Sequence, residues 1–372
     1  MVLYSEPPDS DRVSAATLAR IFDDVRNSYK FLFFIAILDR LEANLFDPAL
    51  PLSTRELILE MLSLAWSPHV YFRLSFGSQD QVTRELDKSA LSRSIIQESA
   101  INPWDRAAIR AQIASRLTDN QLDRFVPYRL VRPFFPETRG MKKDHEVNQR
   151  VAELCEEYFV SRKPPYMFDR SRSKLIMHPA WCAYFRENLA VVRGWVWWNF
   201  LQYMQRCNPN VPAISLKLSP LPARESLDKQ SKFWSTVLAA QPFACIYSGA
   251  PIDSRAFALD HFVPWSFVVH NQLWNLIPTS ATVNSKKSDR LPARDYFEKF
   301  VSAQHGALLV SQQQMTEKVW EDSVKCFIGD LSMPSFGALL DRDRLQKAYQ
   351  TSVFPLLQLA EANGFEPNWT LS

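Results

Sequence analysis

The chain is short of glycine and cysteine, and it has no long uninterrupted apolar run. Its 372 residues include 8 Gly against 24 Pro, so tight glycine turns are few and proline-bounded connections are many. This ratio argues against an all-β fold and favours helices joined by stiff connections. The five cysteines are odd in number and scattered, unlike the paired cysteines of a secreted disulfide scaffold.

The N-terminus also lacks the features of an export signal. Residues 5–11 are polar and acidic, whereas a secretory signal begins basic and continues apolar. The most apolar stretches are residues 31–38, which are too few to cross a bilayer, and residues 189–204, which include Arg193 and Asn199. We therefore expect no membrane span and a cytoplasmic location.

A large excess of one charge is absent as well. The 43 basic and 40 acidic residues leave a net charge of +3. Such a balance provides no general coat for nucleic acid. Any nucleic-acid surface must therefore come from a local cluster of cations.

The length predicts two or three domains, and the pattern divides the chain near residue 222. Residues 1–222 are predicted to form an α-helical recognition or regulatory domain. Residues 223–372 are predicted to form a second domain, with a β-containing core at about 243–291 and C-terminal helices. The fold class is mainly α, or α+β overall. Helices are expected at residues 31–45, 53–67, 80–98, 103–117, 144–160, 179–205, 224–240, 293–304, 314–327 and 342–363.

Prolines exclude helix from two segments of the first domain. Residues 126–135 contain Pro127 and Pro133, and residues 162–166 contain a Pro-Pro pair. Residues 208–222 are also rich in proline and are predicted to be a linker.

One group of polar residues in the second domain has the composition and spacing of a catalytic site. Asp260 and His261 are adjacent, Asn275 follows after thirteen residues, and Asn284 follows after eight more. Asp260 and Asn284 supply hard oxygen atoms for a divalent cation, and His261 can accept a proton near neutral pH. Such a set arises by chance in a chain of this length with a probability of roughly 10⁻³ to 10⁻².

The segment around this group resembles the HNH, or ββα-metal, endonuclease family. The resemblance covers residues 243–289 and implies short strands at 243–247 and 255–261. It further implies a long loop that carries Asn275, and a short helix that begins near Asn284.

The resemblance also implies a role for each member of the group. His261 is the expected general base, Asp260 and Asn284 are the expected metal ligands, and Asn275 is expected to orient His261. Because both protein ligands would be oxygen donors, Mg²⁺ or Mn²⁺ is favoured over Zn²⁺ or Ni²⁺.

The chain departs from the family at its structural metal. Many HNH proteins hold a zinc ion with two Cys-x-x-Cys pairs, whereas the corresponding segments here are Cys245-Ile246-Tyr247-Ser248 and Ser280-Ala281-Thr282-Val283. One cysteine cannot build a four-thiolate site. We expect no structural zinc, and we expect packing of aromatic side chains to hold the domain together.

Several nearby side chains have two interpretations. Lys286, Lys287 and Arg290 follow the motif and are expected to contact DNA phosphates near the scissile bond, although a solvated helix face would have the same composition. His270 is either a second metal or phosphate contact or an exposed loop residue.

A second cationic region lies in the first domain. Residues 121–174 mix cations with aromatic side chains, a combination found in nucleic-acid grooves and also in ordinary packing beneath long side chains. On the first interpretation Arg129, Arg132, Arg170 or Arg172 contacts DNA.

Outside the motif the resemblance is looser. The Ser-Tyr-Lys-aromatic start of residues 28–38 and the Val-Pro-Tyr-Arg segment of residues 126–135 resemble bacterial HNH proteins with a long helical N-terminal region. Among these, the chain is similar to the nuclease component of Zorya-type anti-phage defence. The resemblance implies a DNA endonuclease that nicks one strand per event, with DNA and other defence proteins as partners.

Two alternatives to a DNA endonuclease stay open at this point. One is an RNA-cleaving HNH toxin, and the other is a DNA-binding module whose nuclease fold is inactive. The presence of all four motif residues argues against the inactive module.

Overall fold

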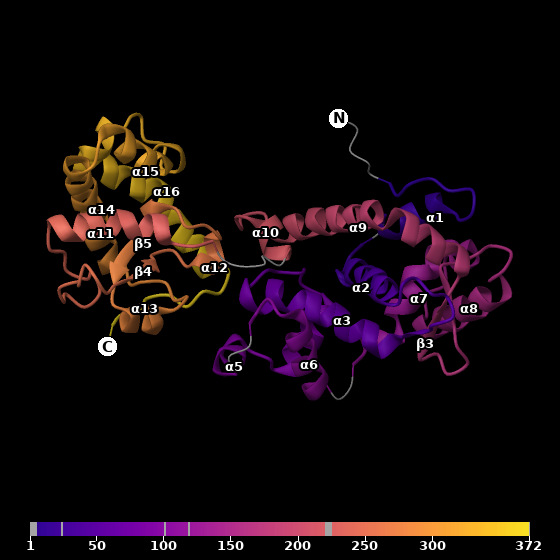
Figure 1. Ribbon diagram of the computed structural model, residues 1–372. Coiled ribbons are helices and arrows are strands. Elements are labelled where there is room, and N and C mark those ends of the chain that lie inside the picture. The colour runs from indigo at the N-terminus through magenta and orange to yellow at the C-terminus, as the bar shows by residue number, and fades with distance from the viewer. Residues whose placement is uncertain (1–5, 24, 100–101, 118–119, 220–224, 372) are drawn as a thin grey trace. The chain divides into compact units, whose positions relative to one another are not determined.

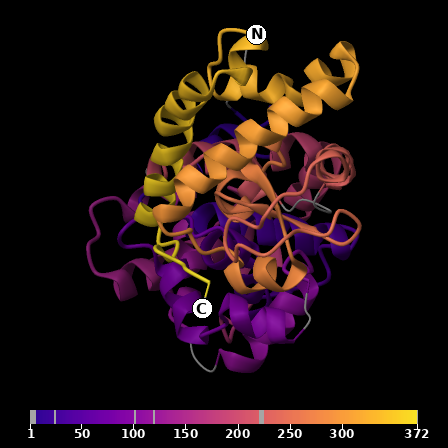
Figure 2. The same cartoon turned by 90° about the vertical axis from the view of Figure 1, so that its left-hand side faces the viewer.

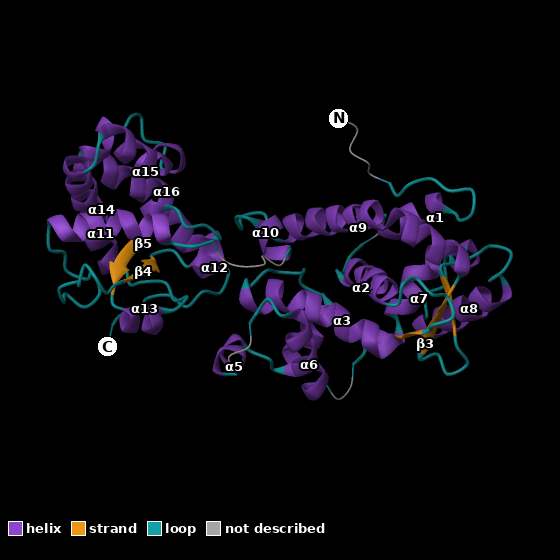
Figure 3. Ribbon diagram, in the orientation of Figure 1, coloured by secondary structure: helices purple, strands orange, loops and turns teal. Residues whose placement is uncertain are grey.

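The computed structural model describes residues 6–23, 25–99, 102–117, 120–219 and 225–371. They group into two compact units, one made of Met1–Pro209 with Lys217–Pro220 and the other of Asn210–Leu216 with Leu221–Ser372. The boundary predicted at residues 222–223 lies outside the described residues. Helices predominate in both units and the strands form two small sheets, which confirms the predicted mainly α, α+β class (Figure 3). None of the helices in the described ranges is long and apolar enough to cross a membrane.

The first unit is mostly helical, and its three-stranded sheet lies at one side of the helices (Figure 1). Its helices are α1 (Ala15–Ala19), α2 (Tyr29–Ala43), α3 (Thr54–Trp66), α4 (Gln81–Ser89), α5 (Arg93–Glu98), α6 (Arg106–Arg116), α7 (Val126–Val131), α8 (Asp144–Glu157) and α9 (Pro179–Cys207), with α10 (Ile214–Leu218) at the boundary of the two units. Short helical turns are η1 (Arg20–Phe22), η2 (Ser67–Tyr71), η3 (Leu122–Arg124), η4 (Arg132–Phe134) and η5 (Pro136–Thr138). The strands are β1 (Leu52–Ser53), β2 (Tyr166–Phe168) and β3 (Lys174–Met177).

Helix α2 is the core of this unit, as predicted from its apolar run. Every side chain from Phe31 to Leu38 is buried, because α3, α7 and α9 all pack against α2. Helix α3 begins next to its predicted start at residue 53, where the Ser53 side chain caps it by accepting a hydrogen bond from Glu56 N at 3.4 Å.

Two predictions for the first unit are wrong in ways that have a local cause. Residues 126–131 form α7 despite Pro127, because that proline occupies the first turn, where its missing N–H is not needed. The single helix predicted over 80–98 is two helices, which are separated near Ala90 with its left-handed φ of 50°.

The three-stranded sheet was not predicted. β3 is its central strand and pairs antiparallel with both neighbours, with Leu175 opposite both Leu52 and Phe168. The strand at residues 52–53 is too short for its pattern to indicate pairing with a segment more than a hundred residues away.

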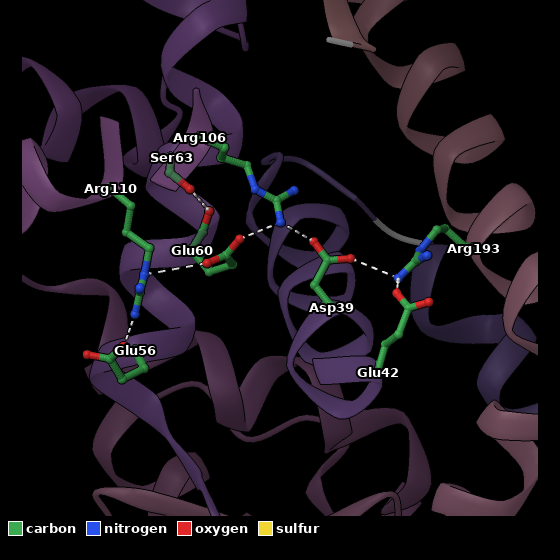
Figure 4. A network of polar contacts seen from close by, with 8 residues as sticks. All are labelled: Asp39, Glu42, Glu56, Glu60, Ser63, Arg106, Arg110 and Arg193. Atoms are coloured by element: carbon green, nitrogen blue, oxygen red, sulfur yellow. Dashed lines mark hydrogen bonds and ion pairs between the residues drawn. The ribbon is translucent and has the colours of Figure 1, made fainter. Parts of the chain in front are cut away.

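A chain of ion pairs connects four helices of the first unit (Figure 4). Arg106 of α6 contacts Asp39 of α2 at 2.8 Å and Glu60 of α3 at 2.6 Å, and Arg193 of α9 contacts Asp39 at 2.9 Å. The side chain of Asp39 is 17% exposed, so these charges are only partly solvated. Partly buried networks of this kind contribute more than isolated surface pairs.

The second unit surrounds the two-stranded antiparallel sheet with helices. Its elements are α11 (Asp228–Ala240), β4 (Ala258–His261), α12 (Trp265–Val268), η6 (Leu273–Asn275), β5 (Leu276–Thr279), α13 (Ala281–Lys287), α14 (Asp295–Gln314), α15 (Glu317–Asp330), η7 (Gly337–Leu340) and α16 (Arg342–Ala362). α14 packs against β5 and α11, while α13 packs against β4. Figures 1 and 2 show the strand pair between α11 and α14 on one side and α13 on the other.

The strands of this unit differ from the predicted ones. Residues 243–247 form no strand and contribute one bridge, from Ala244 to Pro251. The partner of β4 is β5, which lies in a segment predicted to be loop. α13 begins at Ala281, so Asn284 lies in the middle of the helix and not at its start. The start of the helix predicted at residue 224 lies outside the described residues.

Candidate active site

The β4–β5 pair and α13 form a compact ββα unit around the predicted catalytic residues. In the antiparallel register Asp260 lies opposite Ile277 and His261 lies opposite Leu276. The chain then enters α13 at Ser280, whose side chain accepts a hydrogen bond from Val283 N at 3.2 Å. One turn into α13, Asn284 Nδ2 makes a long contact of 3.5 Å with Leu259 O, so its amide group lies over β4.

Asp260 is an internal carboxylate. It is 2% exposed, and its two oxygen atoms accept hydrogen bonds from Tyr247 Oη at 2.6 Å and from Lys287 Nζ at 3.1 Å. Burial raises the pKa of Asp260, while the Lys287 charge and both hydrogen bonds oppose that rise. Each carboxylate oxygen has two lone pairs, so one hydrogen bond to each still allows this group to bind a cation.

Lys287 contacts both Asp260 and His261. Its side chain is 0% exposed, and besides Asp260 its Nζ donates to His261 O at 2.7 Å. The last turn of α13 is therefore fixed to the end of β4 by one cation.

His261 is half-buried at the end of β4, and its ring is held by a residue that we did not predict. Its Nε2 lies 2.9 Å from Asn271 Oδ1. The same amide donates from Nδ2 to Glu225 O at 3.1 Å, which fixes the amide orientation so that its oxygen faces the ring. His261 Nε2 is then the donor, and the neutral ring has its basic lone pair on Nδ1. Nothing in the local sequence distinguishes Asn271 from a solvated loop asparagine.

Asn275 is fully buried and contacts the main chain beside His261. Its Oδ1 accepts from Val263 N at 2.8 Å, its Nδ2 donates to Val263 O at 2.9 Å, and its carbonyl accepts from Phe262 N at 2.9 Å. The Phe262 ring is stacked on the ring of Phe300 in α14, with the two ring centroids 4.0 Å apart. Asn275 therefore contacts the backbone that follows His261, whereas Asn271 contacts the His261 ring.

The three cations predicted to contact phosphate lie in three different environments. Lys286 is exposed on α13. Arg290 is half-buried at the end of the helix, where its guanidinium donates to Lys286 O and lies 5.7 Å from the Trp369 ring. Lys287 is internal, so the structure places it away from any surface on which a phosphate could lie.

His270 is neither a solvent-exposed loop residue nor a member of the Asp260 cluster. Its ring is half-buried against Trp274, with centroids 5.1 Å apart. Burial lowers the pKa of His270, although Asp330 opposes the effect, and this favours the neutral imidazole.

The segments that correspond to zinc-binding pairs are filled by packing. Cys245 is buried with its Sγ 3.1 Å from Thr279 Oγ1. Tyr247 packs against Tyr296 and Trp369, with ring centroids 5.0 and 5.2 Å away. In the part of the chain that the structure describes, no group of three or more His, Cys, Asp or Glu side chains is arranged to hold a metal ion.

Comparison with known proteins identifies this part of the chain. Residues 245–293 match the model of the HNH endonuclease family, which includes β4, β5, α13 and all four motif residues. Searches of the curated proteins and of the solved structures gave no match. The chain thus contains an HNH endonuclease domain, and this domain is that of a nuclease, a hydrolase that acts on nucleic acid.

Proposed function

We propose that this chain, with an HNH endonuclease domain at residues 245–293, is a metal-dependent endonuclease that cuts DNA one strand at a time. The observation that carries the proposal is the ββα arrangement itself. It holds a buried carboxylate, an amide on the facing helix and an imidazole hydrogen-bonded to Asn271 within one short segment.

The donor atoms fit a hard divalent cation. Asp260 and Asn284 offer oxygen atoms from β4 and α13, and Mg²⁺ commonly uses one or two protein ligands together with water and phosphate oxygens. We therefore assign Mg²⁺ or Mn²⁺ to these two residues. When bound, the cation would stabilise the negative charge that develops on the leaving oxygen.

The other residues position and move the proton. His261 is assigned as the base that accepts the proton of the attacking water, and the contact of its Nε2 with Asn271 Oδ1 holds the ring. Asn275 fixes the backbone after His261, and Lys287 fixes both the Asp260 carboxylate and the His261 carbonyl. Lys286, exposed on the same helix, is the cation best placed to contact a phosphate.

One histidine base serves one scissile bond in each binding event. A monomer should therefore convert supercoiled plasmid first to the open-circular form, with linear DNA appearing late. Linear product without an open-circular precursor would instead indicate a dimer that cuts both strands together.

The decisive experiment is plasmid relaxation with Mg²⁺ by the wild-type protein and by His261→Ala. We expect His261→Ala to lose roughly 10²- to 10⁴-fold in rate and to retain its affinity for DNA. The matched control is His145→Ala, which replaces a histidine in the first unit whose side chain is 78% exposed, and which should cut at the wild-type rate. A His261→Ala rate above a tenth of wild type would assign the base elsewhere. Faster cleavage of RNA than DNA would favour the toxin interpretation.

We further propose that the protein is an effector of anti-phage defence and that the region 1–222 recognises the target or regulates the nuclease. The looser resemblance of residues 28–38 and 126–135 supports this role. Cells that express the wild-type chain together with the partners of its defence system should form fewer phage plaques than cells with His261→Ala. Equal plating of the two strains would contradict the proposal.

A further inference from the structure

The first unit contains a cationic cavity that the nuclease chemistry does not use. Its volume is about 680 Å³, and its walls come from the segment before α2, from α7 with η4, and from the turn after η5. Six cationic side chains line it against one acidic residue in the described part of the wall, Asp23. The cations are Arg20, Arg26, Lys30, Arg129, Arg132 and Arg139.

Arg132 is fixed in place on this wall. Its Nε donates to Thr138 Oγ1 at 3.2 Å, and its Nη2 donates to Thr138 O at 2.7 Å and to Met141 O at 3.4 Å. Gly140, with a left-handed φ of +80°, turns the chain so that the Met141 carbonyl comes back toward Arg132. Arg132 Nη1 makes no hydrogen bond with any residue that the structure describes, so one edge of this pre-positioned guanidinium can still donate.

The cluster is electrostatically unfavourable without an anion. Burial lowers the pKa of Arg132, and the neighbouring Arg129 lowers it further, because each cation destabilises the other. Asp144 pairs with Arg129 and relieves part of this repulsion, but the Asp144 side chain is 70% exposed. A bound anion would offset the repulsion between Arg129 and Arg132 and could accept a hydrogen bond from Arg132 Nη1.

The shape and chemistry of the cavity restrict the class of anion. Arginine forks match the oxygen atoms of phosphate, and 680 Å³ lies within the usual range of about 300–1,000 Å³ for small-ligand sites. Tyr29 also lines it and is partly exposed, so its side chain provides apolar surface for a ring. We propose that this cavity binds a small phosphorylated ligand of nucleotide size, with its phosphates on the arginines, and that it gives the first unit a binding site separate from the nuclease site.

Isothermal titration calorimetry of the full chain with ATP, inorganic triphosphate and a single-stranded oligothymidylate tests the proposal. The titrations are done without divalent cations, so that a metal-dependent complex at the nuclease site does not contribute. The test variant is Arg20→Glu with Arg139→Glu, two exposed cations at the cavity. The control is Arg84→Glu with Arg116→Glu, which makes the same charge change at exposed positions of α4 and α6. The milder pair Arg20→Gln with Arg139→Gln is measured as well, in case the charge reversal disturbs folding.

We expect ATP and triphosphate to bind the wild-type chain and the control, and the test variant to bind them at least about ten-fold more weakly. The glutamine pair should lie between the two. No binding of ATP and triphosphate to the wild-type chain would overturn the proposal, and so would an equal loss in the test variant and the control. Binding of the oligothymidylate alone, weakened by the same variant, would overturn it in favour of a nucleic-acid strand. Because no cleavage is measured, these outcomes are independent of whether the nuclease proposal holds.

Discussion

Replacing Lys287 by methionine removes the positive charge that lies against the buried Asp260 carboxylate. Methionine has a similar length and needs no hydrogen bond, so the change deletes the two interactions of Nζ without opening a large cavity. Asp260 would keep only its hydrogen bond from Tyr247, and the His261 carbonyl would lose its donor.

The expected cost follows from the burial of both partners. Lys287 and Asp260 are 0% and 2% exposed, and removing one partner of a buried pair costs about 3–5 kcal/mol. This loss of stability depends on pH, because protonation of Asp260 removes the unpaired buried charge. Without Lys287 the folded-state pKa of Asp260 rises further, so the folded variant binds a proton that the unfolded chain has already released. The loss of stability should therefore be small near pH 5 and largest near pH 8.

Hydrogen exchange measured on peptides of β4 and α13 is the appropriate assay, because the chain has two units that need not unfold together. The matched control is Lys286→Met, one residue away and exposed, which should change stability by less than about 0.5 kcal/mol at either pH. In DNA-binding titrations at several salt concentrations, only Lys286→Met should make the slope of log K against log salt concentration shallower, by about one. Equal stability of the two variants with an equal loss of DNA affinity would refute the internal role of Lys287.

Three further predictions concern the base, a buried lysine and the ion-pair network. Asn271→Ala should lower kcat for nicking roughly ten-fold with little change in KM, because the His261 ring loses its orienting partner; an unchanged kcat would contradict this. Burial lowers the pKa of Lys217 from the ordinary 10.5 to about 7. Between these two pH values Lys217 is protonated in the unfolded chain but largely neutral in the folded protein. Stability against urea should therefore rise from pH 7 to pH 10, and Lys217→Met should abolish that rise and stabilise the protein at pH 7 by roughly 2–4 kcal/mol. Asp39→Ala should lower thermal stability by about 2–3 kcal/mol, because it removes a shared partner of Arg106 and Arg193. Glu187→Ala, which breaks an exposed pair with Arg12, should cost less than about 1 kcal/mol in the same melts.

Several features that depend on local spacing were predicted from the sequence alone. The apolar run of residues 31–38 predicted the buried helix α2, and the helix expected from residue 53 is α3. The order and spacing of Asp260, His261, Asn275 and Asn284 indicated the HNH segment that the family comparison identifies. These signals are readable because helix periodicity, caps and catalytic motifs involve residues that are close along the chain.

Only the tertiary structure decided which polar residues contact each other within the site. Lys286 and Lys287 are indistinguishable in sequence, yet one is exposed and the other is buried against Asp260, because α13 docks on β4 with one face inward. Asn271 reaches His261 only because the loop closes over the end of β4, and Tyr247 reaches Asp260 across thirteen residues. Burial and long-range hydrogen bonds assign these roles, and neither produces a periodic pattern of residues that could be recognised in the sequence.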